Sequence, residues 1–273
     1  VYITYRVLDI ADLTVEGSFP LGAAVAASML SAGYGPIPSF VVAAIAGMVA
    51  GVVTALLHTK MKIPALLAGI LTMIALYSVN LRVMGKANLS LLGTDTTFSI
   101  IRKMLSLNSA YTTLVVGLLA TVLVAVFIYW FFGTEIGAAI RATGFNQQMI
   151  RAQGVDTDVT IMIGLLLSNA LVAISGALVA QSNGFADVGM GTGTIVIGLA
   201  SVIIGEVLFG TRRFKNSIIS VILGSVVYRI VIAVVLQMGM PPNDLKLFTS
   251  ILVAFALAMP LIKSKFGSKK VVG

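Results

Sequence analysis

Apolar runs of about twenty residues recur from one end of this 273-residue chain to the other. A helix needs about 20 predominantly apolar residues to cross a bilayer, whereas a transmembrane barrel shows short alternating segments. Only 10% of the residues are charged, far below the roughly 25% of a soluble domain, which excludes a soluble fold. The sequence therefore predicts an all-α, polytopic membrane protein with eight full spans, at residues 17–33, 36–59, 63–81, 111–132, 157–181, 193–210, 216–237 and 246–262.

The basic residues predict which way these spans run. With the loop 60–62 on the inner side, eleven Lys and Arg residues fall inside and five outside, in agreement with the positive-inside rule. The net charge of +8 is then mainly a topology signal of a cell (plasma or inner) membrane protein, with the lipid bilayer as its partner and no nucleic acid. The inner residues are Lys60, Lys62, Arg141, Arg151, Arg212, Arg213, Lys215, Lys263, Lys265, Lys269 and Lys270, and the outer ones are Arg82, Lys86, Arg102, Lys103 and Lys246.

A short motif repeats within the chain. Gly17-Ser18-x3-Gly22-x-Ala24 recurs as Gly193-Thr194-x3-Gly198-x-Ala200, 176 residues later. The topology puts Gly17 at the inner face and Gly193 at the outer face, so the halves are predicted to be inverted repeats, as in transporters. The short apolar start is interpreted as the end of a missing first helix. The parts of this single transmembrane domain (1–273) are a first repeat at about 1–110, a linking helix at 111–132, an inner loop at 133–156 and a second repeat at 157–273.

Signatures of enzyme active sites are absent from the sequence. There is no cysteine and only one histidine, His58, so neither a thiolate site nor a histidine cluster can form. The glycine-rich run 189–193 lacks the spacing of a phosphate-binding loop, and it is interpreted as close packing or a broken helix entrance. Gly47-x3-Gly51 likewise predicts close helix packing. We expect no catalytic residue, metal or cofactor in this chain.

The long inner loop 133–156 is neither plainly apolar nor of low complexity. Gly144 is predicted to break a first short helix, and Asn146 to cap a second one. Met149 and Ile150 lie on that second helix, where water is a poor environment for them. They are expected either to dock onto another protein or to lie on the lipid interface.

Two stretches of the chain resemble a known family. The loop approximately follows the pattern G-x-x-x-R-A-x-G-x-N-x-x-x-x-x-x-G, and residues 8–22 read LDIADLTVEGSFPLG. The first resembles the cytoplasmic coupling loop of ABC-importer permeases of the branched-chain amino acid and ribose class, and the second resembles the opening of an early helix in that class. The resemblance is greatest to the subgroup that takes up aromatic amino acids such as tryptophan or tyrosine.

The resemblance implies a permease subunit that forms a translocation path by alternating access. Two permease copies would line that path, two separate ATP-binding subunits would carry ATP and Mg²⁺, and an extracellular or periplasmic binding protein would deliver the substrate. An aromatic amino acid is the expected substrate, with a branched-chain amino acid or a sugar as alternatives. The residues expected to couple the permease to the ATPase are Gly137, Arg141, Ala142, Gly144, Phe145, Asn146, Met149, Ile150, Arg151 and Gly154.

Polar residues inside the predicted spans are candidates for the path. A charge in mid-membrane costs about 2.5–3.5 kcal/mol, so Glu206 and Arg229 are expected to face protein or a cavity, Arg229 as a substrate contact or in a structural pair. Asn80 and Asn169 are expected either to line the path or to hold helices together. Glu206 is predicted to be the only deep acid, which counts against a proton-coupled secondary transporter but not against a sodium-coupled one. A channel also remains open.

Overall fold

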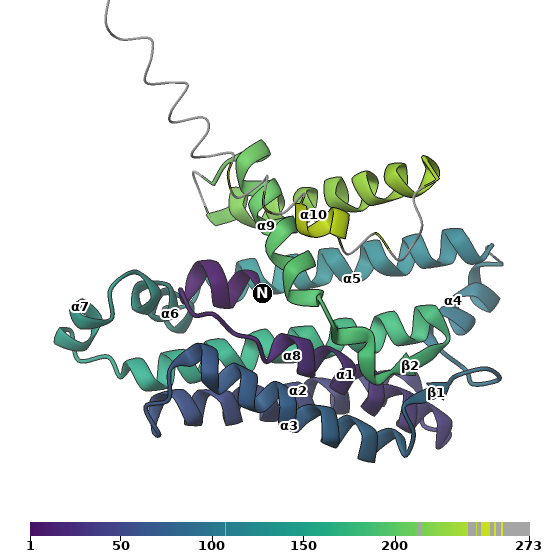
Figure 1. Ribbon diagram of the computed structural model, residues 1–273, viewed down its shortest axis with the longest axis horizontal. Coiled ribbons are helices and arrows are strands. Elements are labelled where there is room, and N and C mark those ends of the chain that lie inside the picture. The colour runs from purple at the N-terminus through teal and green to yellow at the C-terminus, as the bar shows by residue number, and fades with distance from the viewer. Residues whose placement is uncertain are drawn as a thin grey trace, which may run out of the picture. The chain divides into compact units, whose positions relative to one another are not determined.

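Seven of the eight predicted spans are helices in the computed structural model, which describes residues 1–106, 108–211, 214–239, 244, 247–251, 254 and 258 (Figure 1). The eighth, 246–262, lies largely outside these residues, as do Arg212, Arg213, Lys246 and the basic tail. The seven helices are α1 (Val15–Ser31), α2 (Pro36–Thr59), α3 (Ala65–Met84), α5 (Ser109–Phe131), α8 (Thr157–Asn183), α9 (Thr194–Phe209) and α10 (Phe214–Gln237).

Length and hydropathy support a polytopic membrane protein. Six helical stretches in the described residues are long and apolar enough to cross a bilayer, namely α2, α3, α5, α8, α10 and the stretch Val188–Phe209. The helix α1 has 17 residues and is shorter than the roughly 20 that a full span needs. The chain divides into two compact units, Ile3–Thr194 with Val1, and Ile195–Gly273 with Tyr2.

The first unit is a bundle in which α8 packs on α1 and α2, and α1 also packs on α3. Small side chains make this packing close. The four alanines at 23, 24, 26 and 27 of α1 are completely buried. A short helix, η1 (Ile3–Val7), lies before α1 and contacts α8.

Glycines bring the backbones of these helices into contact. A Cβ atom at Gly22 would lie 1.9 Å from the carbonyl oxygen of Ala173, and one at Gly176 would lie 1.9 Å from that of Phe19. Cβ atoms at Gly47 and Gly51 would likewise lie 2.4 Å and 2.5 Å from carbonyl oxygens of α8. The close packing predicted from Gly47-x3-Gly51 is therefore confirmed.

The end of the bundle where α1, α3 and α8 finish is covered by short elements. The strand β1 (Asn88–Ser90) pairs antiparallel with β2 (Phe185–Asp187), and α4 (Thr97–Leu105) follows β1. Buried Leu91 and Ala186 join the ends of α1 and α3 in one hydrophobic cluster. The predicted topology places this end on the outer side.

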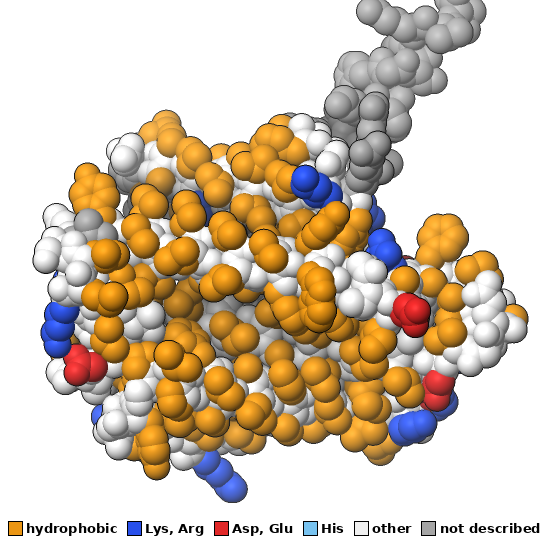
Figure 2. All heavy atoms as spheres, turned by 180° about the vertical axis from the view of Figure 1, so that it is seen from behind, with side chains coloured by type: hydrophobic (Ala, Val, Ile, Leu, Met, Phe, Trp, Pro, Cys, Tyr) orange, Lys and Arg blue, Asp and Glu red, His pale blue; other side chains and the backbone are white. Residues whose placement is uncertain are grey.

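The helix α5 presents most of its side chains outward, as a lipid-facing span would. Only Thr112 and Val116 are buried along its 23 residues. Figure 2 shows hydrophobic side chains over most of the visible face, with most of the charged side chains toward its left and right edges. This distribution matches the low charge content that identified a membrane protein.

The second unit contains α10 and nearly all of α9. A Cβ atom at Gly205 would lie 2.0 Å from the carbonyl oxygen of Ser220, and one at Gly224 would lie 2.1 Å from that of Ser201. The later residue of α9 meets the earlier residue of α10, and the earlier residue of α9 meets the later one of α10. The two helices therefore pack antiparallel with their backbones in contact.

Candidate functional site

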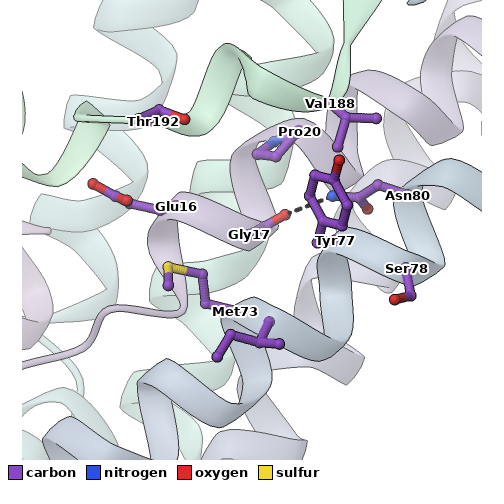
Figure 3. A pocket seen from close by; sticks show the side chains of 10 residues that line it. Glu16, Gly17, Pro20, Met73, Tyr77, Ser78, Asn80, Val188 and Thr192 are labelled. Carbon is purple, nitrogen blue, oxygen red and sulfur yellow. Dashed lines mark hydrogen bonds between the residues drawn. The ribbon is translucent and has the colours of Figure 1, made fainter. Parts of the chain in front are cut away.

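A pocket of about 350 Å³ lies in the first unit, between α1, α3 and the segment that follows β2 (Figure 3). This volume lies within the roughly 300–1,000 Å³ that small-molecule sites occupy. Gly17 lies against Met73 and Leu76, which are in the middle of α3, so the pocket is at mid-depth of a predicted span. Its lining residues are Glu16, Gly17, Pro20, Met73, Ile74, Tyr77, Ser78, Asn80, Val188 and Thr192.

The chain after β2 turns back along α1 to form one wall of this pocket. The short helix η2 (Val188–Gly191) packs on α1. A Cβ atom at Gly191 would lie 2.0 Å from the carbonyl oxygen of Glu16, and Gly193 has a φ of +84° and donates its backbone N–H to Glu16 Oε1 at 3.0 Å. The prediction that Gly17 and Gly193 lie at opposite faces is therefore wrong, because the start of α9 meets the start of α1.

Among the described residues that line the pocket, Glu16 is the charged one. It lies in the first turn of α1 and is partly buried, and Gly193 N–H is its hydrogen-bond donor. Sequence reasoning missed Glu16 because it stands just outside the predicted span 17–33. The signal available was an acid directly before an apolar run of small residues.

Asp12 is also deep in the bundle, so the prediction that Glu206 is the only deep acid is wrong. The Asp12 side chain is 3% exposed. Its Oδ1 accepts from the backbone N–H of Thr14 at 3.0 Å, and its Oδ2 accepts from Asn169 Nδ2 at 2.9 Å. These bonds fix the extended chain that leads into α1.

Asn80 lines the pocket from α3 and is completely buried. Its Nδ2 donates to the carbonyl oxygen of Gly17 at 3.3 Å, whereas its Oδ1 accepts no hydrogen bond from the described residues. The orientation of the amide follows from chemistry, since a carbonyl oxygen requires a donor. An unused buried acceptor therefore stands beside the pocket.

Asn169 lies in the core and does not line the pocket. Its Oδ1 accepts from Ser18 Oγ at 2.7 Å, and its Nδ2 donates to Asp12 Oδ2 and to the carbonyl oxygen of Leu165 at 3.0 Å. The amide thus joins α1 to α8. Of the two alternatives predicted for Asn169, this geometry favours holding helices together.

Replacing Asn169 by Ala should destabilise the protein by about 1–3 kcal/mol, because Ser18 Oγ and Asp12 Oδ2 each lose a buried partner. Thermal unfolding of the purified protein in detergent measures this loss. Asn183→Ala is the matched control, since Asn183 is an exposed asparagine at the end of the same helix, α8. An Asn169→Ala protein that melts with the wild type would contradict the structural role.

Glu206 and Arg229 lie in the second unit, and Asn80 and Asn169 lie in the first. Glu206 is partly buried on α9, and Arg229 is exposed on α10. Gly205 packs against Ser220, and nine further residues at 1.5 Å each place Arg229 about 13 Å farther along α10. The two residues therefore lie at different positions along the helix pair.

The predicted coupling loop forms two short helices, α6 (Glu135–Phe145) and α7 (Gln147–Ala152), beyond the start of α8 (Figure 1). A Cβ atom at Gly137 would lie 2.3 Å from the carbonyl oxygen of Phe131, and one at Gly144 would lie 1.8 Å from that of Val7. Thr143 Oγ1 and Thr160 Oγ1 are hydrogen-bonded at 2.8 Å. Backbone contacts therefore hold α6 against α5 and η1, and a side-chain hydrogen bond holds it against α8.

Asn146 separates the two helices as predicted, but Gly144 does not. The Asn146 side chain accepts from the backbone N–H of Met149 at 3.0 Å and caps α7. The prediction of a break at Gly144 is wrong, since α6 continues to Phe145 and the glycine instead permits contact with Val7. Gly154 has a φ of +85° just beyond α7, as is usual after a helix end.

The exposed apolar side chains of this loop differ from those expected. Ile150 is 5% exposed and packs inward, so the prediction that it needs a partner surface is wrong. Phe145 is 89% exposed and Met149 is 44% exposed. Phe145 and Met149 together are called the α6–α7 apolar surface below.

Two arginines and an alanine complete the predicted coupling set. Arg151 donates to Thr157 Oγ1 and reaches Asp158 Oδ1 at 3.5 Å, so it ties α7 to the start of α8. Arg141 is exposed and Ala142 is half-buried on α6. The guanidinium group of Arg141 therefore lies at the surface of α6.

Comparisons with known proteins agree with this architecture. The family model described as "Branched-chain amino acid transport system / permease component" matches residues 1–259. No solved structure matches the chain.

Named relatives extend the likeness over most of the chain. A "Tyrosine transport system permease protein" of Clostridioides difficile (strain R20291) is 39% identical over 94% of this chain and 84% of its own length. An uncharacterized protein of Rickettsia prowazekii (strain Madrid E) is 35% identical over 94% of this chain and 90% of its own length. An "Autoinducer 2 import system permease protein" of Yersinia pseudotuberculosis is 28% identical over 60% of this chain and 45% of its own length.

These relatives are membrane permeases and not enzymes where a role is named, and the six helical stretches able to cross a bilayer fit a multi-pass membrane protein. The chain belongs to the family of permease components of branched-chain amino acid transport systems.

Proposed function

We propose that this protein is the permease subunit of an ATP-driven importer whose substrate is an aromatic amino acid. The observation that carries the proposal is the α6–α7 apolar surface, which stands on two short helices anchored by glycine contacts. Such a surface suits a docked partner, because exposed Phe and Met side chains are enriched at protein interfaces. The name of the tyrosine permease relative supports the substrate class.

In this proposal the subunit works with several partners. Two permease copies enclose the path, and an ATP-binding subunit docks on each α6–α7 apolar surface, with ATP and Mg²⁺ held by that partner. An extracellular or periplasmic binding protein delivers the substrate to the outer side. Rocking of two inverted repeats, about 1–110 and 157–273, would alternate access to the path.

An ion-coupled secondary transporter is the second candidate, favoured by one observation. Asp12 and Glu16 place two carboxylates within the bundle, and buried acids often serve ion or proton pathways. Each carboxylate oxygen of Asp12 already accepts a buried hydrogen bond, one from Thr14 and one from Asn169, which indicates a structural role for that residue. Glu16 is the carboxylate left to bind a ligand.

Reconstitution should show ATP-dependent uptake. The permease is co-expressed with its ATP-binding subunit and placed in proteoliposomes with the binding protein outside and ATP inside. We expect accumulation of labelled tyrosine or tryptophan that requires hydrolysable ATP, while a non-hydrolysable analogue serves as the control. Uptake by the permease alone, driven by a sodium or proton gradient, would instead establish the secondary transporter.

A further inference from the structure

We propose that the pocket between α1, α3 and residues 188–192 is an intramembrane selection site, in which the Glu16 carboxylate receives the α-ammonium group of the transported amino acid. This inference rests on the proposed function and names the group that recognises its substrate. Glu16 is the charged residue that lines the pocket. The pocket would therefore recognise the substrate a second time, after the binding protein has released it.

The electrostatic balance at Glu16 favours a ligand that presents an ammonium group to it. Holding a charge at mid-membrane costs about 2.5–3.5 kcal/mol on insertion scales, and Gly17 places this carboxylate level with the middle of α3. Its position in the first turn of α1 offsets only about 0.3–1 kcal/mol through the helix dipole. The ammonium group of a bound amino acid would supply the remaining stabilisation.

The hydrogen bonds of Glu16 leave room for such a ligand. Oε1 accepts the N–H of Gly193 at 3.0 Å, and the second oxygen, Oε2, has no donor among the described residues. A carboxylate has about four acceptor positions, and an ammonium group brings three donors. Among the described residues, none of those that line the pocket is a lysine or arginine that would compete for it.

The rest of the pocket suits an aromatic side chain. Pro20, Met73, Ile74, Tyr77 and Val188 supply an apolar wall. Figure 3 shows Glu16 at one end of the lining side chains and Tyr77 with Asn80 at the other. A ligand charged at one end and aromatic at the other fits this order.

Asn80 adds a preference within the aromatic amino acids. Its Oδ1 is a buried acceptor without a donor from the described residues, and leaving such a group unpaired is unfavourable. A tyrosine hydroxyl or a tryptophan indole N–H could donate to it, whereas phenylalanine could not. A site that hydrogen-bonds a substrate group discriminates strongly against analogues without it.

Thermal stabilisation of the purified permease–ATPase complex, without the binding protein, tests the site directly. A ligand that binds only the folded state raises the unfolding temperature. We expect millimolar tyrosine to raise it and N-acetyltyrosine, which lacks the ammonium charge, to leave it unchanged. Glu16→Gln should abolish the tyrosine shift and keep the unliganded melting temperature, because the amide oxygen can still accept the Gly193 N–H.

Three further variants make the result specific. Glu16→Asp keeps the charge and should retain part of the shift, and Asp95→Asn removes an exposed carboxylate that pairs with Lys103 and should retain all of it. Asn80→Leu should bring the tyrosine shift down to that of phenylalanine. ATP-driven uptake should fall in Glu16→Gln by about tenfold or more, the factor that corresponds to 1.4 kcal/mol.

Several outcomes would overturn the proposal. They are an unchanged tyrosine shift in Glu16→Gln, an equal shift with N-acetyltyrosine in the wild type, or a shift with sodium chloride in place of the amino acid, which would indicate an inorganic cation site. The two proposals fail separately. A tyrosine shift that depends on Glu16 without ATP-driven uptake rejects only the importer, and uptake that does not depend on Glu16 rejects only the selection site.

Discussion

Gly22→Val should prevent the first unit from folding, because α1 and α8 touch through their backbones at this point. A Cβ atom on residue 22 would lie 1.9 Å from the carbonyl oxygen of Ala173 and 2.5 Å from its Cα atom. Backbone atoms cannot rotate away as a flexible side chain can, so the two helices must separate. We expect a loss of about 3 kcal/mol or more, the upper end of overpacking, measured as the yield of monodisperse protein in detergent and its unfolding temperature.

Gly117→Val is the matched control for this effect. Gly117 is also a glycine inside a long apolar helix, α5, but nothing lies within 4 Å of a Cβ atom there. It should change stability by no more than about 0.5 kcal/mol, as surface substitutions usually do. Equal yields of the two variants would show that the α1–α8 contact does not limit folding.

The spans could be predicted because the bilayer leaves a chain few alternatives. A helix satisfies every backbone hydrogen bond within its own segment, so an apolar run bounded by breaking residues is sufficient evidence. Pro36 and Thr59 bound α2 both in the prediction and in the structure. Asn146 was also identified correctly, since its capping bond to Met149 is local.

The pocket could not be predicted, because its contacts join distant parts of the chain. Glu16 and Gly193 are 177 positions apart, and no periodicity shows that the chain after β2 turns back along α1. Gly144 illustrates the same limit. A glycine that breaks a helix and one that admits a neighbouring backbone look alike in sequence, and only Val7 beneath it distinguishes them.

Burial of neighbouring residues in α7 also depends on tertiary contacts. Met149 and Ile150 are adjacent and both apolar, yet they point about 100° apart around a helix. Ile150 is buried while Met149 is partly exposed. The sequence predicts both equally as contacts for a partner, whereas in the structure Phe145 and Met149 are the exposed pair.

The double variant Phe145→Ala with Met149→Ala should release the ATP-binding subunit from the permease. Phe145 is 89% exposed and Met149 is 44% exposed, so both side chains are available to fill a pocket of the partner. Interface residues of this kind contribute about 2 kcal/mol or more when they anchor a contact, which corresponds to about thirtyfold in Kd. Co-purification of the complex and ATP-driven uptake should both fall.

Two controls distinguish the loss of docking from misfolding: the unfolding temperature of the variant and a substitution on the opposite side of α6. The double variant should keep the wild-type unfolding temperature, because it removes exposed side chains. Ile150→Ala removes a buried side chain, so it should lower the free energy of unfolding by about 2–5 kcal/mol. Ile136→Ala is the positional control, since Ile136 is 52% exposed on the same helix but nine residues, and so half a turn, away from Phe145. It should retain the ATP-binding subunit. Retention by the double variant, or equal release by Ile136→Ala, would place the docking surface elsewhere, because a specific contact must depend on which side of α6 carries the apolar group.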